Sequence, residues 1–202
     1  MKTIFPVAFF FAQLALRSQS IFLPASDGTV FDGGGANTGD YLTIAPTSGE
    51  QGDLQFASFD FANYSTIMLE LNSYGVPPLQ ANPVLVFGYD NASGTLGQSD
   101  FNAGTYIGAW TFPANLLPGQ EEFFDVTTFV QSVQGSYFGF DLRAEDGVDL
   151  FSSTASNYGT PPELIATVPE PPASCLIVLG AGAWAFGRRI CFARRFLARA
   201  AS

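Results

Sequence analysis

The stretch TIMLELN, residues 66–72, decides the fold class of this chain. Ile67, Leu69 and Leu71 are apolar and alternate with mostly polar residues. Side chains of a β-strand point alternately to the two faces of its sheet. A period of two residues therefore predicts a strand with one face in a core and the other toward water.

A second stretch, SYFGFDLR at residues 136–143, has the same alternation. Phe138, Phe140 and Leu142 form one row, whereas Asp141 and Arg143 belong to the other. Similar runs, rich in β-branched and aromatic residues and separated by turn residues, occur throughout the middle of the chain. The predicted strands span residues 41–45, 54–61, 66–72, 84–89, 105–112, 136–143, 148–152 and 163–168.

These elements predict an all-β fold, a jelly-roll-like β-sandwich of about eight strands. The runs at 54–61 and 84–89 are apolar on both faces, as expected for central strands covered on two sides or for strands that meet a loop. One helix is predicted at 127–134, where Asp125 or Thr127 caps the start and Phe129, Val130 and Val133 pack inward.

The amino terminus has the pattern of an export signal. Met1 and Lys2 precede an apolar run at residues 4–16, and Ser18-Gln19-Ser20 forms a small-x-small cleavage site. A signal peptide is therefore predicted at residues 1–20, with cleavage after Ser20 or, as the second choice, after Ala25. The exported β-sandwich domain is expected to span residues 21–167.

The charges are distributed unevenly along the chain. All 18 acidic residues lie between Asp27 and Glu170, and Arg143 is the one basic residue in that span, which gives this part a formal charge of −17. Such a charge excludes a basic nucleic-acid-binding surface. A solvated acidic surface without a specific site is the preferred interpretation.

Two residue types central to many enzymes are missing from the exported part. The chain contains no histidine, which removes Ser-His-Asp and Cys-His catalysis and every histidine-containing metal site. Both cysteines, Cys175 and Cys191, lie near the carboxy terminus, so no disulfide is expected within the sandwich. We therefore expect a protein that is not an enzyme.

The last 35 residues, 168–202, have three parts in a fixed order. The motif VPEP consists of Val168, Pro169, Glu170 and Pro171. An apolar run follows at residues 173–187 and predicts a transmembrane helix, which residues beyond the run can extend to spanning length. Five arginines without an acid end the chain and predict a cytoplasmic tail; they are Arg188, Arg189, Arg194, Arg195 and Arg199. Arg188 and Arg189 would stop the helix at the membrane interface.

This order resembles the PEP-CTERM sorting signal of exported bacterial proteins. The resemblance implies an exosortase as a partner, a membrane anchor before processing, and final localisation at the cell surface or in an exopolysaccharide matrix. The alternative is an ordinary carboxy-terminal anchor with a proline-rich stalk. Both interpretations place the body of the protein outside the cell.

The body of the chain resembles the DNRLRE, or disaggregatase-related, β-sandwich domains. The matching pieces are ASDGTVFD, LQFASFDF, STIMLELN, DVTTFV and GFDLRAEDGVDLFSS followed by PPELIATV, and together they cover most of residues 27–168. The chain lacks the tryptophan-glutamate element of richer members. The resemblance therefore implies a sandwich fold and assigns no ligand residue.

One segment suggests a metal site. YDNASGTLGQSDF, residues 89–101, resembles the calcium loops of dockerins when Gly94 takes the place of the loop glycine. Asn91, Ser93 and Asp100 then occupy ligand positions, but Tyr89 occupies the first, where calcium needs a carboxylate. We prefer an acidic turn and no cofactor, with calcium as the alternative.

Two further patterns bear on glycans. Glu121-Glu122 and Glu145-Asp146 are paired acids, but adjacent residues of a strand point to opposite faces, so neither pair suits glycosidase chemistry. The row formed by Tyr106, Gly108, Trp110 and Phe112 would be a sugar platform if exposed, and we expect it to be core.

The sequence thus predicts a non-catalytic exported protein. A carbohydrate-binding module is the alternative, and an enzyme acting on glycans ranks third.

Overall fold

The computed structural model describes residues 19–39, 41–74, 83–113, 117–145, 147, 149–153 and 160–169. Its strands and helices belong to one compact unit, Ser18–Val168. The strands are β1 Gln19–Phe22, β2 Ser26–Phe31, β3 Ala36–Asn37, β4 Tyr41–Ile44, β5 Glu50–Ala57, β6 Thr66–Asn72, β7 Val84–Asp90, β8 Thr105–Trp110, β9 Glu121–Asp125, β10 Tyr137–Ala144, β11 Asp149–Ser152 and β12 Glu163–Thr167. The helices are the α-helix α1 Thr127–Ser132 and the 3-10 helices η1 Pro46–Ser48 and η2 Gln98–Asp100.

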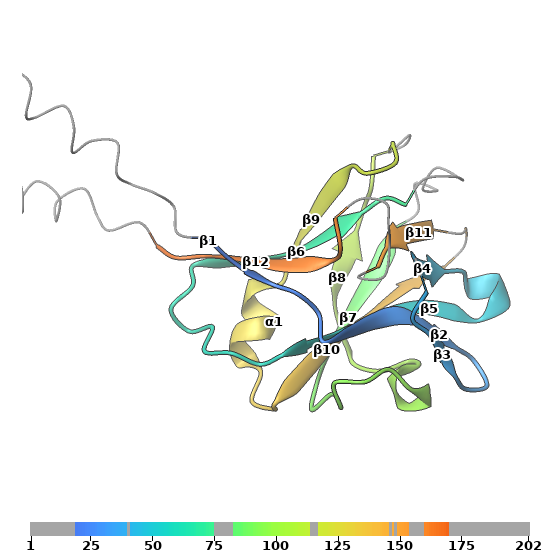
Figure 1. Cartoon of the computed structure of the whole chain (residues 1–202), viewed down its shortest axis with the longest axis horizontal. Helices are drawn as coiled ribbons and strands as arrows, with labels where there is room; N and C mark the ends of the chain where they lie inside the picture. Colours follow the sequence, from blue (N-terminus) through green and yellow to red (C-terminus); the bar gives the residue numbers. More distant parts are fainter. Residues whose placement is uncertain are drawn as a thin grey trace, which may run out of the picture. The chain divides into compact units, whose positions relative to one another are not determined.

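The strands form two main antiparallel sheets that pack face to face (Figure 1). One sheet has the order β1-β12-β6-β9 and the other the order β3-β2-β5-β10-β7-β8, while β11 and β4 form a separate pair. The fold is therefore all-β and sandwich-like, as the alternating stretches predicted.

The core lies between the two sheets. The smaller sheet supplies Ile67, Leu69 and Leu71 from β6, all fully buried. The larger sheet supplies Phe138 and Phe140 from β10, together with Leu54 and Phe56 opposite them on β5. Val84 and Val86 of β7 belong to the same core. Burial of one such side chain stabilises the fold by roughly 1.5–3 kcal/mol, so these alternating rows account for the packing of the two layers.

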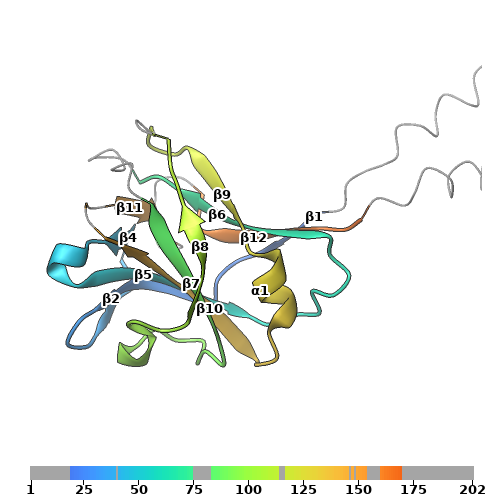
Figure 2. The ribbon, with the colours of Figure 1, turned by 180° about the vertical axis from the view of Figure 1, so that it is seen from behind.

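Helix α1 closes one end of the sandwich (Figure 2). Thr127 joins it to β6, because its Oγ1 accepts a hydrogen bond from the Ile67 N–H over 2.8 Å. Phe129 packs edge-on against Phe138 and Phe140, with ring centroids 6.2 and 5.5 Å apart. The predicted helix is confirmed, although it ends at Ser132 rather than at residue 134. Its N-cap residue is Val126, which makes no side-chain cap, and not Asp125 or Thr127 as predicted.

The eight predicted strands are all present, seven of them with ends within two residues of the predicted ones. One strand is displaced by four residues, and four strands were missed. The run predicted at 54–61 is β5, which begins at Glu50 and ends at Ala57, because its partner β10 begins opposite Ala57. Phe59 is consequently 61% exposed, outside the sheet. The missed strands are β1, β2, β3 and β9; each is short or carries few apolar residues in alternation.

Strand β1 lies at the edge of the smaller sheet and pairs with β12, with Gln19 opposite Thr167. The two ends of the sandwich therefore lie side by side. Cleavage after Ser20 would remove half of β1, and cleavage after Ala25 would remove all of it. Residues 1–18 of the predicted leader lie outside the described residues.

The described helices are all short, and none has the length and apolar character that crossing a membrane requires. The transmembrane helix predicted at 173–187 lies outside the described residues.

Candidate functional site

The most unusual feature of the sandwich is a group of buried acids on the outer face of the larger sheet. Asp53 of β5 and Asp141 of β10 lie directly opposite each other across the two strands, and neither is exposed. Asp100 of η2 belongs to the connection between β7 and β8 and is only 5% exposed. Residues distant in sequence thus place three carboxyl groups in one buried region.

Tyr89 of β7 links this group to the sheet. Its hydroxyl donates a hydrogen bond to Asp53 Oδ1 over 2.7 Å and accepts one from Gln55 Nε2 over 3.1 Å. The ring lies across Gly139 of β10, where any side chain would overlap it. The glycine in the otherwise aromatic YFGF stretch therefore makes room for Tyr89.

Arg143 is the one basic residue among those that the structure describes. Its Nε and Nη2 donate to Asp141 Oδ2 over 2.8 and 2.6 Å. Nη2 also donates to the Ala103 carbonyl oxygen over 2.6 Å, which ties the β7–β8 connection to the sheet. The guanidinium carbon lies 3.7 Å from the Phe87 ring centroid, a cation–π contact.

One guanidinium does not balance three buried carboxyl groups. Burial raises the pKa of Asp53 well above its usual value, despite the hydrogen bond from Tyr89. Burial also raises the pKa of Asp141 to about 7, against the opposing effect of Arg143, and raises the pKa of Asp100. The cluster is therefore electrostatically unfavourable when fully ionised.

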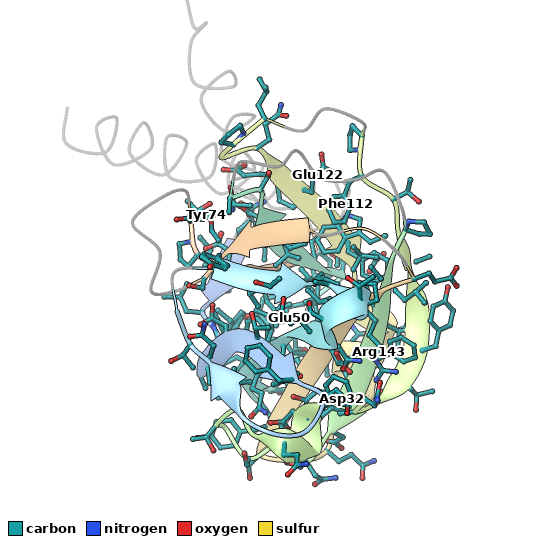
Figure 3. The ribbon with its side chains drawn as sticks, turned by 90° about the vertical axis from the view of Figure 1, so that its right-hand side faces the viewer. Asp32, Glu50, Tyr74, Phe112, Glu122 and Arg143 are labelled. Carbon is teal, nitrogen blue, oxygen red and sulfur yellow. The ribbon has the colours of Figure 1, made fainter. Side chains whose placement is uncertain are left out.

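A hollow of about 230 Å³, with both polar and apolar walls, lies against Arg143. It is lined by Asp32, Glu50, Gln51, Asn102 and Arg143, and Figure 3 shows Asp32, Glu50 and Arg143 on this side of the molecule. Gln51 and Asn102 bond each other twice, at 2.9 Å each, and hold the covering connection in place.

Several side chains of the dockerin-like segment at 89–101 hydrogen-bond within the protein. Asp90 accepts hydrogen bonds from the backbone N–H groups of Gln134 and Gly135, which lower its pKa. Ser93 bonds to Thr95, and Asp100 accepts from the Gly97 N–H over 2.7 Å. No three Asp, Glu, His or Cys side chains of the described part of the chain form a metal-binding group.

A larger groove, of about 790 Å³, lies between α1 and the ends of β7 and β8. Its lining combines the apolar Phe129 and Ile107 with the hydroxyls of Thr105, Thr128 and Ser132. Sequence reasoning missed this groove because its walls come from separate elements.

The row at 105–112 is divided between the two faces of the sheet. A bulge between Val86 and Phe87 of β7 leaves Ile107 of β8 unpaired, so Tyr106 pairs with Phe87 and is 53% exposed. Trp110 and Phe112 are buried and stack at 4.9 Å, as expected for core. The prediction that Tyr106 shares their face was wrong because it assumed an unbroken period of two.

The remaining predicted residues are placed as follows. Glu121 and Glu122 occupy successive positions of β9, opposite Asn72 and Leu71, and alternate in direction as expected. Glu145 follows β10, and Asp146 lies outside the described residues.

The sorting residues are only partly described. Val168 and the exposed Pro169 come directly after β12. Glu170, Pro171, Arg188 and Arg189 lie outside the described residues.

The chain matches no known protein-family model, and no curated protein sequence is significantly similar to it.

Proposed function

We propose that this chain is a non-catalytic exported protein of the cell surface or extracellular matrix, sorted by an exosortase through its carboxy-terminal signal. The order of VPEP, apolar run and arginine tail carries this proposal. It is the combination that a membrane-embedded processing enzyme needs: an extended, accessible motif held beside a membrane anchor. A jelly-roll-like domain related to the DNRLRE sandwiches would be the displayed cargo.

The sandwich is compatible with this role. The motif begins directly after β12, outside the paired strands, and β12 itself is held between β1 and β6. Substitution within the motif should therefore leave the core of the sandwich intact. Processing would then be separable from folding.

The test is the intact mass of the protein recovered from the surface and medium of its native host. The wild-type chain should end near VPEP or carry an added group there. Glu170→Ala should accumulate with its full arginine tail, whereas Glu145→Ala, an exposed acid outside the motif, should mature normally. Normal maturation of Glu170→Ala would reject sorting and leave an ordinary membrane anchor.

The groove between α1, β7 and β8 favours a second candidate, binding of exopolysaccharide. Hydroxyls beside an aromatic ring are suited to a sugar. Thr128→Trp should fill the groove and abolish retardation of the protein in gels containing the host polysaccharide, without lowering its thermal stability. Leu117→Ala, at an exposed residue that does not line the groove, is the control. Equal retardation of all three proteins would remove the groove from consideration.

A further inference from the structure

Three buried oxygen atoms on the outer face of the larger sheet have no hydrogen-bond partner. They are Asp53 Oδ2, Gln55 Oε1 and Asp141 Oδ1, and the residues that carry them are 0% exposed. A buried polar atom without a partner costs roughly 1–3 kcal/mol, and more when it is charged. With both carboxyl groups ionised, all three atoms are acceptors, so the missing partner is a donor, a proton shared between the two carboxyl groups, or a cation.

The three atoms belong to neighbouring positions of one surface. Asp53 and Asp141 are opposite each other on β5 and β10, where Cβ atoms of facing residues lie about 4.5–5.5 Å apart. Gln55 lies two residues beyond Asp53 on the same face of β5. Two like charges in this position repel each other unless something positive lies between them.

The protein's own cation does not fill this role. Arg143 binds the other oxygen of Asp141, Oδ2, and then extends to the Ala103 carbonyl. Tyr89 likewise occupies only Oδ1 of Asp53. Each aspartate is thus held by one oxygen, and its second oxygen is left without a partner.

We propose that Asp53, Gln55 and Asp141 bind a calcium ion through these three oxygens. Calcium prefers carboxylate and amide oxygens and takes water for the rest of its six to eight ligands. These proposed ligands are two carboxylates and one amide, not three acidic side chains. It is also distinct from the dockerin-like positions Asn91 and Ser93.

The hollow beside Arg143 carries Asp32 and Glu50, whose charges attract cations to this side of the molecule. The connection between β7 and β8 covers the cluster through Asp100 and Ala103. Calcium bound to the three oxygens links β5 to β10 beneath this connection and stabilises the folded protein. This inference does not depend on sorting or on polysaccharide binding.

The test uses the full chain in a non-ionic detergent, stripped with a calcium chelator and held at constant ionic strength near neutral pH. Thermal unfolding is followed by circular dichroism with and without calcium chloride. Calcium at about one hundred times its Kd should raise Tm by roughly 5–10 °C. Titration calorimetry should find one ion per chain.

Asp53→Asn keeps the size of the side chain and removes its charge. It should abolish the calcium-dependent rise while leaving the calcium-free Tm equal or higher, because a buried repulsion is relieved. Asp141→Asn should also abolish the calcium-dependent rise in Tm, and it provides the same test if Asp53→Asn does not fold. Asp60→Asn, in an exposed turn, should retain it.

Absence of a Tm shift and of binding heat in the wild-type chain would overturn the proposal. A shift that persists in Asp53→Asn or Asp141→Asn would also overturn it, because calcium would then bind elsewhere.

Discussion

Substitutions in the edge strand β1 test whether the packed domain begins with this strand. Phe22, its last residue, packs against Phe59, Phe61 and Tyr64 with centroid separations of 5.5, 5.1 and 6.2 Å. Truncation of a fully buried phenylalanine to alanine costs about 3–5 kcal/mol. Phe22 is only partly buried, so we expect Phe22→Ala to lower the free energy of unfolding by about 1.5–3 kcal/mol.

The assay is urea unfolding of the full chain in detergent, followed by circular dichroism. With a slope of about 1–3 kcal/mol per molar urea, the midpoint should fall by about 1 M. Ile21→Ala is the matched control, because Ile21 is the adjacent residue of β1 and is 61% exposed. It should change the free energy of unfolding by less than about 0.5 kcal/mol.

Equal effects of Phe22→Ala and Ile21→Ala, or no effect of either, would refute the packing argument for β1. The result also bears on export. Cleavage after Ser20 keeps Phe22 and its aromatic contacts, whereas cleavage after Ala25 removes them. We therefore expect a mature protein beginning at Ile21 to be more stable than one beginning at Ser26.

Two further predictions concern the outer faces of the sheets. Gly139→Ala should lower the free energy of unfolding by about 2–4 kcal/mol, because the new methyl group displaces Tyr89 from Asp53. The cost of the double variant with Tyr89→Ala should be clearly less than the sum of the two single costs. Additive costs in urea unfolding would contradict this explanation. Burial, and then repulsion from Glu163 directly opposite, raises the pKa of Glu70 in the folded state. Ionisation of Glu70 should therefore reduce the stability of the fold as the pH rises from 4.5, the usual pKa of a glutamate, through the higher folded-state pKa. Glu70→Gln should therefore flatten the fall in Tm over this range, and an unchanged pH profile would contradict the assignment.

The buried rows of the sandwich follow from local sequence. Ile67, Leu69 and Leu71 on β6 and Phe138 and Phe140 on β10 lie in the core because successive side chains of a strand must alternate between faces. Where the period holds, the pattern identifies the buried row without knowledge of the partner strand. The all-β class and the strands that carry these rows could therefore be predicted.

The period fails where a neighbouring strand imposes an irregularity. The bulge opposite Val86 and Phe87 turns Tyr106 outward, although its own sequence continues the row of Trp110 and Phe112. Similarly, β5 ends at Ala57 because β10 begins there, and not because its apolar run ends. Pairing between strands determined these features.

The export and sorting expectations rest on residues 1–20 and 168–202, whose order of charge, proline and apolar length is a property of the linear chain. The buried carboxyl groups and the closeness of the two ends of the sandwich depend on its folding. Asp53, Asp100 and Asp141 lie far apart in the sequence and belong to no common motif. Strand pairing places Asp53 opposite Asp141, and the β7–β8 connection buries both of them together with Asp100. Such a group has no signature in sequence, because its electrostatic cost arises only when antiparallel pairing and burial bring the charges together.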